Sequence, residues 1–254
     1  MTDLQHHDYA MSFGPVAAQY EAARPSYPPE LLDSVERLAG RPLRDAEVLD
    51  VGAGTGIATR LLRARGARVT AVEPSEGMAR QLLLSCPGTT VVKAGGEELP
   101  FHDSTVDLVT YAQAFHWTDP ARSVPEAVRV LRPGGALAVW WNRPDSTVPW
   151  LAASRDRLVA ALTPYHPNVR SDSTADSLAG YGLRVTDVEL AWERRTTVDG
   201  LIAELGSRSH LAVLPADVRA GVLAAERTAL LAEFPDGSVL QPWRLDLSVG
   251  VSAD

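Results

Sequence analysis

The stretch "AQAFHWTD" (112–119) places Gln113, His116 and Trp117 directly after "VDLVTY", a run of residues that is typical of a buried strand. A plain loop favours Gly, Asn, Asp or Pro at such a point. An amide, an imidazole and an indole that leave a strand together are better suited to the rim of a pocket. We therefore treat this stretch as a candidate site, whose chemistry depends on what the preceding chain binds.

A glycine-rich stretch earlier in the chain, "LDVGAGTG" (49–56), provides a place for that ligand. Gly52 and Gly54 permit a tight turn and a close approach of the backbone to a bound molecule. Gly56 follows Gly54 after one residue, whereas the dinucleotide fingerprint has two residues there. The phosphate-binding pattern G-x-x-x-x-G-K-[ST] is absent from the sequence. The glycines thus predict a ligand site without a pyrophosphate to cradle.

Glu73 ends the next expected strand, 21 positions after Gly52. A carboxylate at this point can accept hydrogen bonds from both hydroxyls of a ribose. The alternative is an acid at the start of a helix, where the helix dipole stabilises a negative charge. The preceding glycines and the strand context favour the ribose.

The elements that would position these residues alternate between strand and helix. Strands are expected at 46–54, 68–74, 89–94, 105–111 and 133–142, and helices at 27–40, 56–66, 75–86 and 120–132. This alternation predicts a parallel sheet with helices on both faces. Ligands of such sheets bind outside the carboxyl ends of the strands, where the glycines, Glu73 and the stretch 113–117 all fall.

The remainder of the chain is less regular. Helices are expected at 147–163, 198–206 and 215–233, and strands at 182–192 and 241–251. We expect a lid and first helix at 1–45, a ligand-binding core at 46–143, and substrate-covering helices with the last two strands of the same sheet at 144–254. The fold class is α/β, with a doubly wound, mostly parallel, seven-stranded sheet.

Composition narrows the possible partners. The chain has 254 residues, a net charge of −8 and a pI of about 5.3, so a basic surface for nucleic acid is not expected. Cys86 is the single cysteine, and the six histidines show no metal-ligand spacing, so no metal is expected. The polar N-terminal sequence and the lack of an apolar run of about 20 residues predict a cytoplasmic protein without a membrane span. We expect either a monomer or a homodimer.

Five stretches in order resemble one known family. They are "VLDVGAGTG", "AVEPSEGM", "AGGEELPF", "VDLVTYAQAFHWTD" and "RVLRPGGALAVWWN". Together they are similar to the class I S-adenosylmethionine-dependent methyltransferases, and more narrowly to a small-molecule subgroup that includes trans-aconitate methyltransferase-like proteins. The resemblance covers about residues 12 to 143 and implies a Rossmann-like fold.

The resemblance also implies roles for individual positions. Gly52, Ala53 and Gly54 would pass under the methionine and ribose part of S-adenosylmethionine, and Glu73 would hold the ribose. The other cofactor-binding positions that it implies are Pro74 and Met78 beside the adenine, Gly96 and Glu97 at the adenine edge, and Gln113 near the methionine end. "FGPVAAQYEAARPSYP" resembles the family's N-terminal lid, in which Tyr20 and Arg24 would close over the amino-acid portion. Many relatives carry an acid or a hydroxyl where this chain has Gly95, so adenine recognition would rest on Glu97 and backbone groups.

The methyl acceptor is less defined by the sequence. A carboxylic acid with a pKa near ~4 is ionised at neutral pH, whereas a phenol near ~10 would need a base. His116 and His210 are the candidate catalytic residues. Arg24, Arg143 and Arg208 could bind an acidic acceptor, and Trp117 and Trp141 could line its pocket, although most arginines are solvated surface groups. Alternation along a strand sends Trp140 and Trp141 to opposite faces, so at most one of them should reach the pocket.

We predict a methyltransferase that acts on a small molecule, with a carboxylate or hydroxyl oxygen as acceptor. N- or C-methylation is the alternative among enzymes. A cyclase or a regulatory protein that keeps the cofactor without transferring its methyl group is the alternative outside this activity, because a fold does not fix a function.

Overall fold

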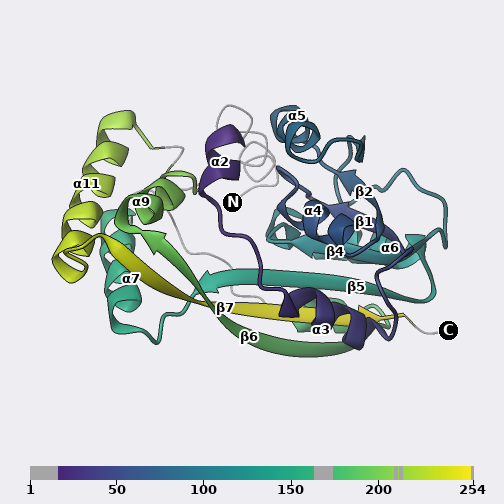
Figure 1. Ribbon diagram of the computed structural model, residues 1–254. Coiled ribbons are helices and arrows are strands. Elements are labelled where there is room, and N and C mark those ends of the chain that lie inside the picture. The colour runs from purple at the N-terminus through teal and green to yellow at the C-terminus, as the bar shows by residue number, and fades with distance from the viewer. Residues whose placement is uncertain (1–16, 163–173, 209–210, 212–213, 253–254) are drawn as a thin grey trace.

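The computed structural model describes residues 17–162, 174–208, 211 and 214–252. Seven strands form one sheet in the order β3-β2-β1-β4-β5-β7-β6 (Figure 1). They are β1 (Glu47–Val51), β2 (Arg68–Val72), β3 (Thr90–Val92), β4 (Val106–Ala112), β5 (Leu131–Pro144), β6 (Arg184–Thr197) and β7 (Ser238–Val251). Strands β1 to β5 pair in parallel, and β7 runs antiparallel to both of its neighbours. This confirms the predicted mostly parallel, Rossmann-like sheet.

Helices cover both faces of this sheet because each carries one apolar side. On one face, α3 (Glu30–Ala39) and α4 (Ile57–Ala64) pack against β1, β2 and β5 through residues such as Leu31, Val35 and Leu62. On the other face, α6 (Pro120–Val130) and the short α8 (Thr174–Ala179) bury Val124 and Leu178. α5 (Glu76–Ser85) follows β2 and buries Leu82 against the first strands. The sheet is thereby held rigid beneath its carboxyl edge.

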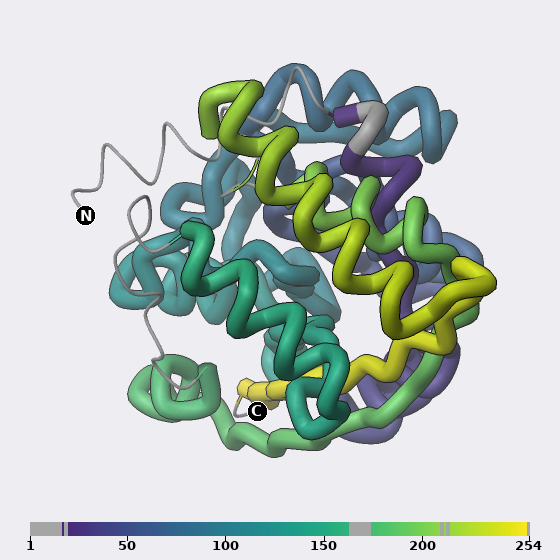
Figure 2. The backbone as a smooth tube through the Cα atoms, turned by 90° about the vertical axis from the view of Figure 1, so that its left-hand side faces the viewer, coloured from purple at the N-terminus to yellow at the C-terminus, as the bar shows by residue number. Residues whose placement is uncertain are grey.

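A third group of helices lies beyond the carboxyl end of β5. It consists of α7 (Pro149–Leu162), α9 (Val198–Gly206) and α11 (Ala216–Glu233), which lie side by side in Figure 2. We call these three helices the cap. Their contact layer is apolar and contains Leu158, Leu162 and Leu205. β6 and β7 extend over 14 residues each and lead into this cap, which makes them longer than the strands predicted at 182–192 and 241–251.

The N-terminal helix α2 (Ala17–Ala23) lies between the cap and the first half of the sheet (Figure 1), in contact with α9 and α5. Its position brings residues from the start of the chain to the carboxyl edge of the sheet. The sequence analysis did not predict α2 or α8, because helices of seven and six residues are too short to show a clear helical period.

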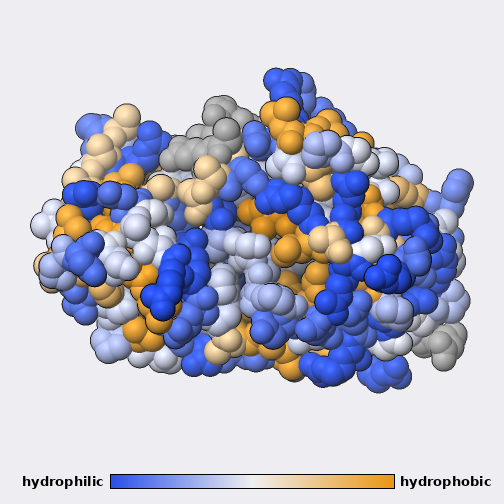
Figure 3. All heavy atoms as spheres, viewed as in Figure 1, coloured by the Kyte–Doolittle hydropathy of each residue, from blue (hydrophilic) through white to orange (hydrophobic). Residues whose placement is uncertain are grey.

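The surface is largely polar on the face shown in Figure 3, with an apolar patch at the top over α5. Leu83 and Leu84 of that helix are 48% and 71% exposed. Among the described residues, no helix is both long and apolar enough to cross a membrane.

Candidate functional site

The turn between β1 and α4 contains three glycines, of which Gly52 and Gly54 were expected to approach a ligand. Gly52, Gly54 and Gly56 have φ angles of 68°, 58° and 91°, which favour glycine. A Cβ atom at Gly52 would lie 2.4 Å from the Cβ atom of Ala114, so the close packing of this turn also requires glycine. A Cβ atom at Gly54 would meet no other atom within 4 Å. The backbone at Gly54 therefore faces open space that a ligand can occupy.

Glu73 lies directly beside this turn, just past the end of β2. Its Oε2 atom accepts a hydrogen bond from the backbone N–H of Gly54, and its Oε1 atom accepts one from the N–H of Ser75, both at 2.8 Å. The residue is only 6% exposed. Burial, together with the negative charge of Asp50, raises the pKa of the Glu73 carboxyl. Glu73 thus supports the glycine turn and still borders the space beside it.

Asp50 is a supporting residue that the sequence analysis missed. This carboxylate of β1 is fully buried, and it accepts hydrogen bonds from the hydroxyls of Thr59 at 2.6 Å and Thr110 at 3.0 Å. Burial raises the pKa of Asp50 to about 6. Asp50 joins β1 to α4 and β4 directly below the glycine turn. The available signal was an acidic residue inside the apolar strand "EVLDV".

The opening stretch 112–119 forms another wall of the same region. Gln113 has a φ angle of 60°, which is unusual for a residue with a side chain and indicates a constrained backbone. Its Nε2 atom donates a hydrogen bond to the backbone oxygen of Asn142 at 2.8 Å. The following 3-10 turn, η2 (Phe115–Trp117), presents His116 and Trp117 with ring centroids 4.4 Å apart. His116 is exposed and Trp117 is half-buried.

These walls enclose a cavity of about 890 Å³, which we call the first cavity. It lies at the carboxyl ends of β1, β2 and β4, where such sheets bind ligands. The predicted site residues that line it are Tyr20, Gly52, Gly54, Glu73, Pro74, Met78, Gly96, Glu97, Gln113, His116 and Trp117. The structure therefore brings most of the predicted cofactor positions and one candidate catalytic histidine to a single space.

Tyr111 is a second residue that sequence reasoning did not single out. Its side chain is fully buried on β4 and lines the first cavity, and burial raises the pKa of its hydroxyl. The hydroxyl lies near Ser123 but makes no hydrogen bond that meets normal geometry with a described residue. A Cβ atom at Gly96 would lie 2.6 Å from this hydroxyl, so glycine keeps the space beside it open.

Two of the predicted cofactor residues do not line the first cavity. The side chain of Ala53 packs with Ala71 and Leu82 in the core. The guanidinium of Arg24 lies 4.5 Å from the ring centroid of Tyr20, and Tyr20 is the residue of this pair that borders the cavity. Their roles in cofactor binding stay predictions.

Trp140 and Trp141 point to opposite faces of the sheet, as strand alternation predicts. Trp140 is buried in the core with Tyr27, at a ring distance of 5.8 Å. Trp141 packs on the other face, where its ring lies 5.2 Å from His116 and its Nε1 atom donates a hydrogen bond to Thr174. Trp141 therefore supports His116 from behind and does not line the first cavity itself.

Two of the three arginines that could bind an acidic acceptor line a different space. Arg143 and Arg208 both border a second cavity, of about 630 Å³, between the cap and the ends of β5 and β7. Arg143 forms exposed ion pairs with Asp246 and Glu189, and Arg208 pairs with Glu204. His210 lies outside the described residues. Within the described ranges, no group of His, Cys, Asp and Glu side chains is arranged to hold a metal ion.

Comparison with known proteins identifies the family. Residues 49–139 match the model of a methyltransferase domain. The chain is 37% identical over 228 residues to an uncharacterized methyltransferase of Mycobacterium tuberculosis, covering 90% of this chain and 88% of the relative. The chain belongs to the S-adenosylmethionine-dependent methyltransferases.

Two further similarities place this methyltransferase among its relatives. A solved structure from Anaeromyxobacter dehalogenans, described as a putative type II methyltransferase, matches with a TM-score of 0.68 and 27% identity, over 91% of this chain and 97% of that one. The malonyl-[acyl-carrier protein] O-methyltransferase of Methylococcus capsulatus is 38% identical over 137 residues, which is 50% of this chain and 49% of that relative. The second similarity covers about half of each protein.

The residues of the first cavity fit S-adenosylmethionine, the cofactor of this family. The open face of Gly54 and the carboxylate of Glu73 lie together at the strand ends, as a ribose requires. The unpaired Tyr111 hydroxyl beside Gly96 and the half-buried Glu97 provide polar groups, and Met78 and Pro74 provide apolar ones. Each of these assignments to a part of the cofactor follows from the family resemblance.

Proposed function

We propose that this methyltransferase acts on a small molecule and that the accepting atom is a carboxylate or hydroxyl oxygen. The observation that carries the proposal is that His116 and Trp117 line the same cavity as Gly54 and Glu73. A cofactor held at the glycine turn and an acceptor placed beside the His116–Trp117 pair would then share one space.

The chemistry at this site needs position more than a reactive protein group. When bound, S-adenosylmethionine supplies a methyl group on a sulfonium sulfur, which an oxygen nucleophile can displace in line. Gln113 and Trp141 fix the 113–117 stretch, because one is hydrogen-bonded to the backbone of Asn142 and the other packs against His116. Fixing both reactants in this way contributes through pre-organisation, which is worth up to ~7–11 kcal/mol in well-oriented reactions.

His116 has one of two roles, depending on the acceptor. With a hydroxyl acceptor, its imidazole removes the proton from the oxygen, which requires the neutral form of the histidine. With a carboxylate acceptor, no proton has to move, and His116 contributes a polar contact to the bound acid. Oxygen as the acceptor is supported by the Methylococcus relative that is named as an O-methyltransferase, over the shared half of the chain.

We also propose that residues 8–24 act as a lid over the cofactor. The part of this segment that the structure describes, from α2 to Arg24, brings Tyr20 to the cavity and stacks Arg24 on the same ring. Order in the lid would increase when the cofactor binds, as in other enzymes that exclude water by closing a segment.

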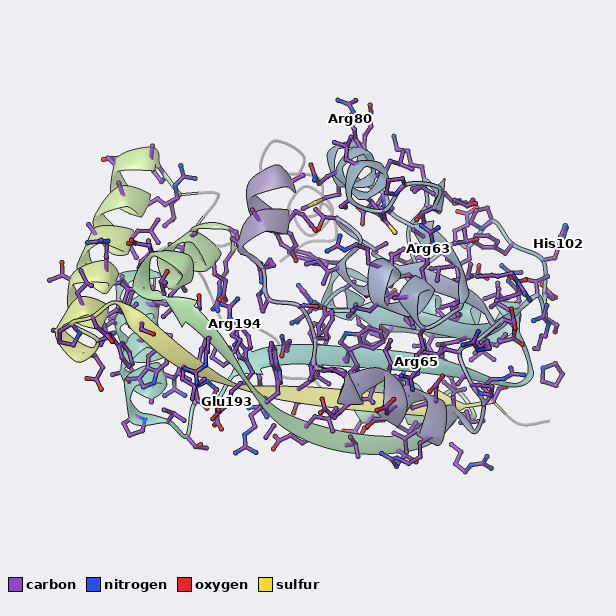
Figure 4. The ribbon with its side chains drawn as sticks, in the orientation of Figure 1. Arg63, Arg65, Arg80, His102, Glu193 and Arg194 are labelled. Carbon is purple, nitrogen blue, oxygen red and sulfur yellow. The ribbon has the colours of Figure 1, made fainter. Side chains whose placement is uncertain are left out.

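The test combines methyl transfer with a matched pair of histidine variants. Radiolabelled S-adenosylmethionine is offered with a panel of small carboxylic acids, phenols, amines and carbon nucleophiles. An accepted oxygen substrate is then used for pH profiles of His116→Asn. His102→Asn is the control, because His102 is an exposed histidine at the opposite end of the molecule from the cap (Figure 4). A phenol substrate predicts that His116→Asn lowers turnover and removes the acidic limb of the profile. A carboxylate substrate predicts a raised KM and no such limb.

Transfer of the label to nitrogen or carbon acceptors alone would refute oxygen methylation. A His116→Asn variant that matches the parent in turnover, KM and pH profile would remove His116 from the acceptor site and leave it a structural role.

A further inference from the structure

The second cavity, between the cap and the ends of β5 and β7, has an apolar body. It measures about 630 Å³, within the range typical of small-molecule sites. Its wall is formed by side chains from all three cap helices, principally Trp150, Leu151, Leu158, Leu201, Leu205 and Leu230. The lining residues of α7 run from Trp150 to Leu162, which corresponds to about 18 Å along a helix axis. This length suits an elongated apolar molecule.

One end of the cavity carries buried charges. Glu204 of α9 is only 1% exposed, and its two oxygens pair with Arg208 at 2.8 Å and with Arg194. Arg194, which Figure 4 shows where β6 leads into α9, also donates from its Nε atom to Gln241 at 2.8 Å. Glu204, Arg208 and Gln241 line the cavity directly.

This charged end has one more positive than negative group. Two guanidinium groups, those of Arg194 and Arg208, share the single carboxylate of Glu204. Burial lowers the pKa of Arg194, and repulsion from Arg208 acts in the same direction. The Nε atom of Arg208 is buried and has no hydrogen-bond partner among the described residues. Buried donors are normally paired, so this atom and the surplus charge need an acceptor.

A neighbouring ion pair between the cap helices has no such surplus of positive charge. Arg157 of α7 binds Glu226 of α11 through two hydrogen bonds, both at 2.8 Å, and Glu226 is 2% exposed. In that pair one guanidinium meets one carboxylate, and neither residue lines the cavity.

We propose that the second cavity binds a small organic anion with an apolar body, whose negative group pairs with Arg208. The apolar part lies among the leucines of α7, α9 and α11, and the anionic group supplies the acceptor that the Arg208 Nε atom lacks. The first cavity and the second share no lining residue, so this site is separate from the cofactor site and does not depend on the proposed acceptor.

The test uses decanoate as the probe and 1-decanol as its uncharged counterpart. Calorimetry on the full chain should show binding of one decanoate per chain, and saturating decanoate should leave the affinity for S-adenosylhomocysteine unchanged. Arg208→Gln should weaken decanoate by at least tenfold while changing decanol less than about twofold, because only the charged ligand loses a charge-assisted hydrogen bond. Ser154→Met, which adds volume to the buried α7 wall, should weaken both ligands.

Arg227→Gln is the matched control, because Arg227 lies on α11 but pairs with Asp199 at the surface and does not line the cavity. Because loss of Arg208 leaves Glu204 with one partner, the folding of each variant is checked by thermal unfolding. If Arg208→Gln does not fold, the effect of Ser154→Met on decanoate binding tests whether the ligand occupies this cavity. The proposal is overturned if decanoate does not bind in the millimolar range, if it competes with S-adenosylhomocysteine, or if Arg208→Gln and Arg227→Gln bind it equally well. Failure of methyl transfer in the earlier test would leave these binding results unaffected.

Discussion

Replacing Glu73 by glutamine should weaken both the apo fold and cofactor binding. The two oxygens of Glu73 each accept one backbone N–H, from Gly54 and Ser75, at 2.8 Å. A glutamine side chain has one acceptor oxygen and one NH₂ group. One of the two N–H groups would therefore face another donor at a site that is only 6% exposed.

The size of the effect follows from these contacts. An unsatisfied buried donor costs about 1–3 kcal/mol, which we expect as the loss in the free energy of unfolding without ligand. A ribose held by the same carboxylate would lose charge-assisted hydrogen bonds worth about 1.5–3 kcal/mol. That loss corresponds to an affinity for S-adenosylhomocysteine that is about 12- to 160-fold weaker.

Glu76→Gln provides the matched control for these measurements. Glu76 is an exposed acid three residues further on, and its ion pair with Arg80 joins two side chains that are both more than 70% exposed. Exposed pairs of this kind contribute little, so its substitution should change stability by less than about 1 kcal/mol and leave ligand affinity intact.

Urea unfolding and calorimetry separate the two effects of the Glu73 substitution. A variant that loses stability but binds S-adenosylhomocysteine as tightly as the parent would restrict Glu73 to supporting the turn. A variant with unchanged stability would refute the hydrogen-bond argument itself.

Three further predictions concern the same region. Gly52→Ala should lower the free energy of unfolding, measured in urea, by more than about 2 kcal/mol, because the new methyl group would lie 2.4 Å from the Cβ atom of Ala114. Gly54→Ala should lower it by only about 1 kcal/mol and should mainly reduce the affinity for S-adenosylhomocysteine. Burial raises the pKa of Asp50 to about 6, so Asp50 contributes stability below about pH 4 that is lost as the pH rises through about 6. The free energy of unfolding of Asp50→Asn, relative to that of the parent, should therefore increase by up to about 3 kcal/mol between pH 4 and pH 6. A difference that stays constant with pH would contradict the burial argument. The ligand should protect the N-terminal segment of the parent from protease, and Tyr20→Ala should weaken S-adenosylhomocysteine binding and remove that protection. Cleavage of the parent that does not change on ligand addition would argue against a lid, and equal protection in parent and variant would argue against a role for Tyr20.

The parallel half of the sheet was predictable because its signals are local. The strands from β1 to β4 are short apolar runs, and β5 contains the apolar run 136–141. Residues less suited to the core follow these runs, such as the glycines after β1 and Gln113 after β4. The rule that parallel strands share a carboxyl edge then places Glu73 and Gln113 near one another without any knowledge of contacts.

The supporting residues of the site were not predictable in this way. Asp50 and Tyr111 lie inside apolar strands, where a polar side chain gives no sign of which neighbour it contacts. The partners of Asp50 come from α4 and β4, and their approach depends on the packing of helix against sheet. Burial, which raises the pKa of Asp50, is a property of that packing.

The positions of Arg143 and Arg208 depended on long-range pairing. Both were expected near an acceptor because Arg143 follows the expected strand at 133–142 and Arg208 lies between the expected helices at 198–206 and 215–233. The antiparallel register places Arg143 opposite Arg244 of β7, and the carboxylates that bind Arg143 come from β6 and β7. Arg208 is held by Glu204, one turn earlier on α9. Neither register nor helix packing in the cap can be read from local sequence, so the two arginines line a cavity that was not expected.

β5 explains how one strand serves both cavities. Successive side chains of a strand point to opposite faces, so Trp141 and Arg143 share one face while Trp140 and Asn142 share the other. Gln113, which lines the first cavity, is hydrogen-bonded to the backbone oxygen of Asn142, and the next residue, Arg143, lines the second cavity. β7 pairs with β5 as far as Pro144. On the other side β4 pairs with β5 only as far as Trp140, and beyond it the Gln113 side chain binds the backbone oxygen of Asn142. The backbone between the cavities therefore has partners on both sides. A change of side chain in this part of β5 would therefore act on one cavity at a time, whereas a shift of its backbone would reach both.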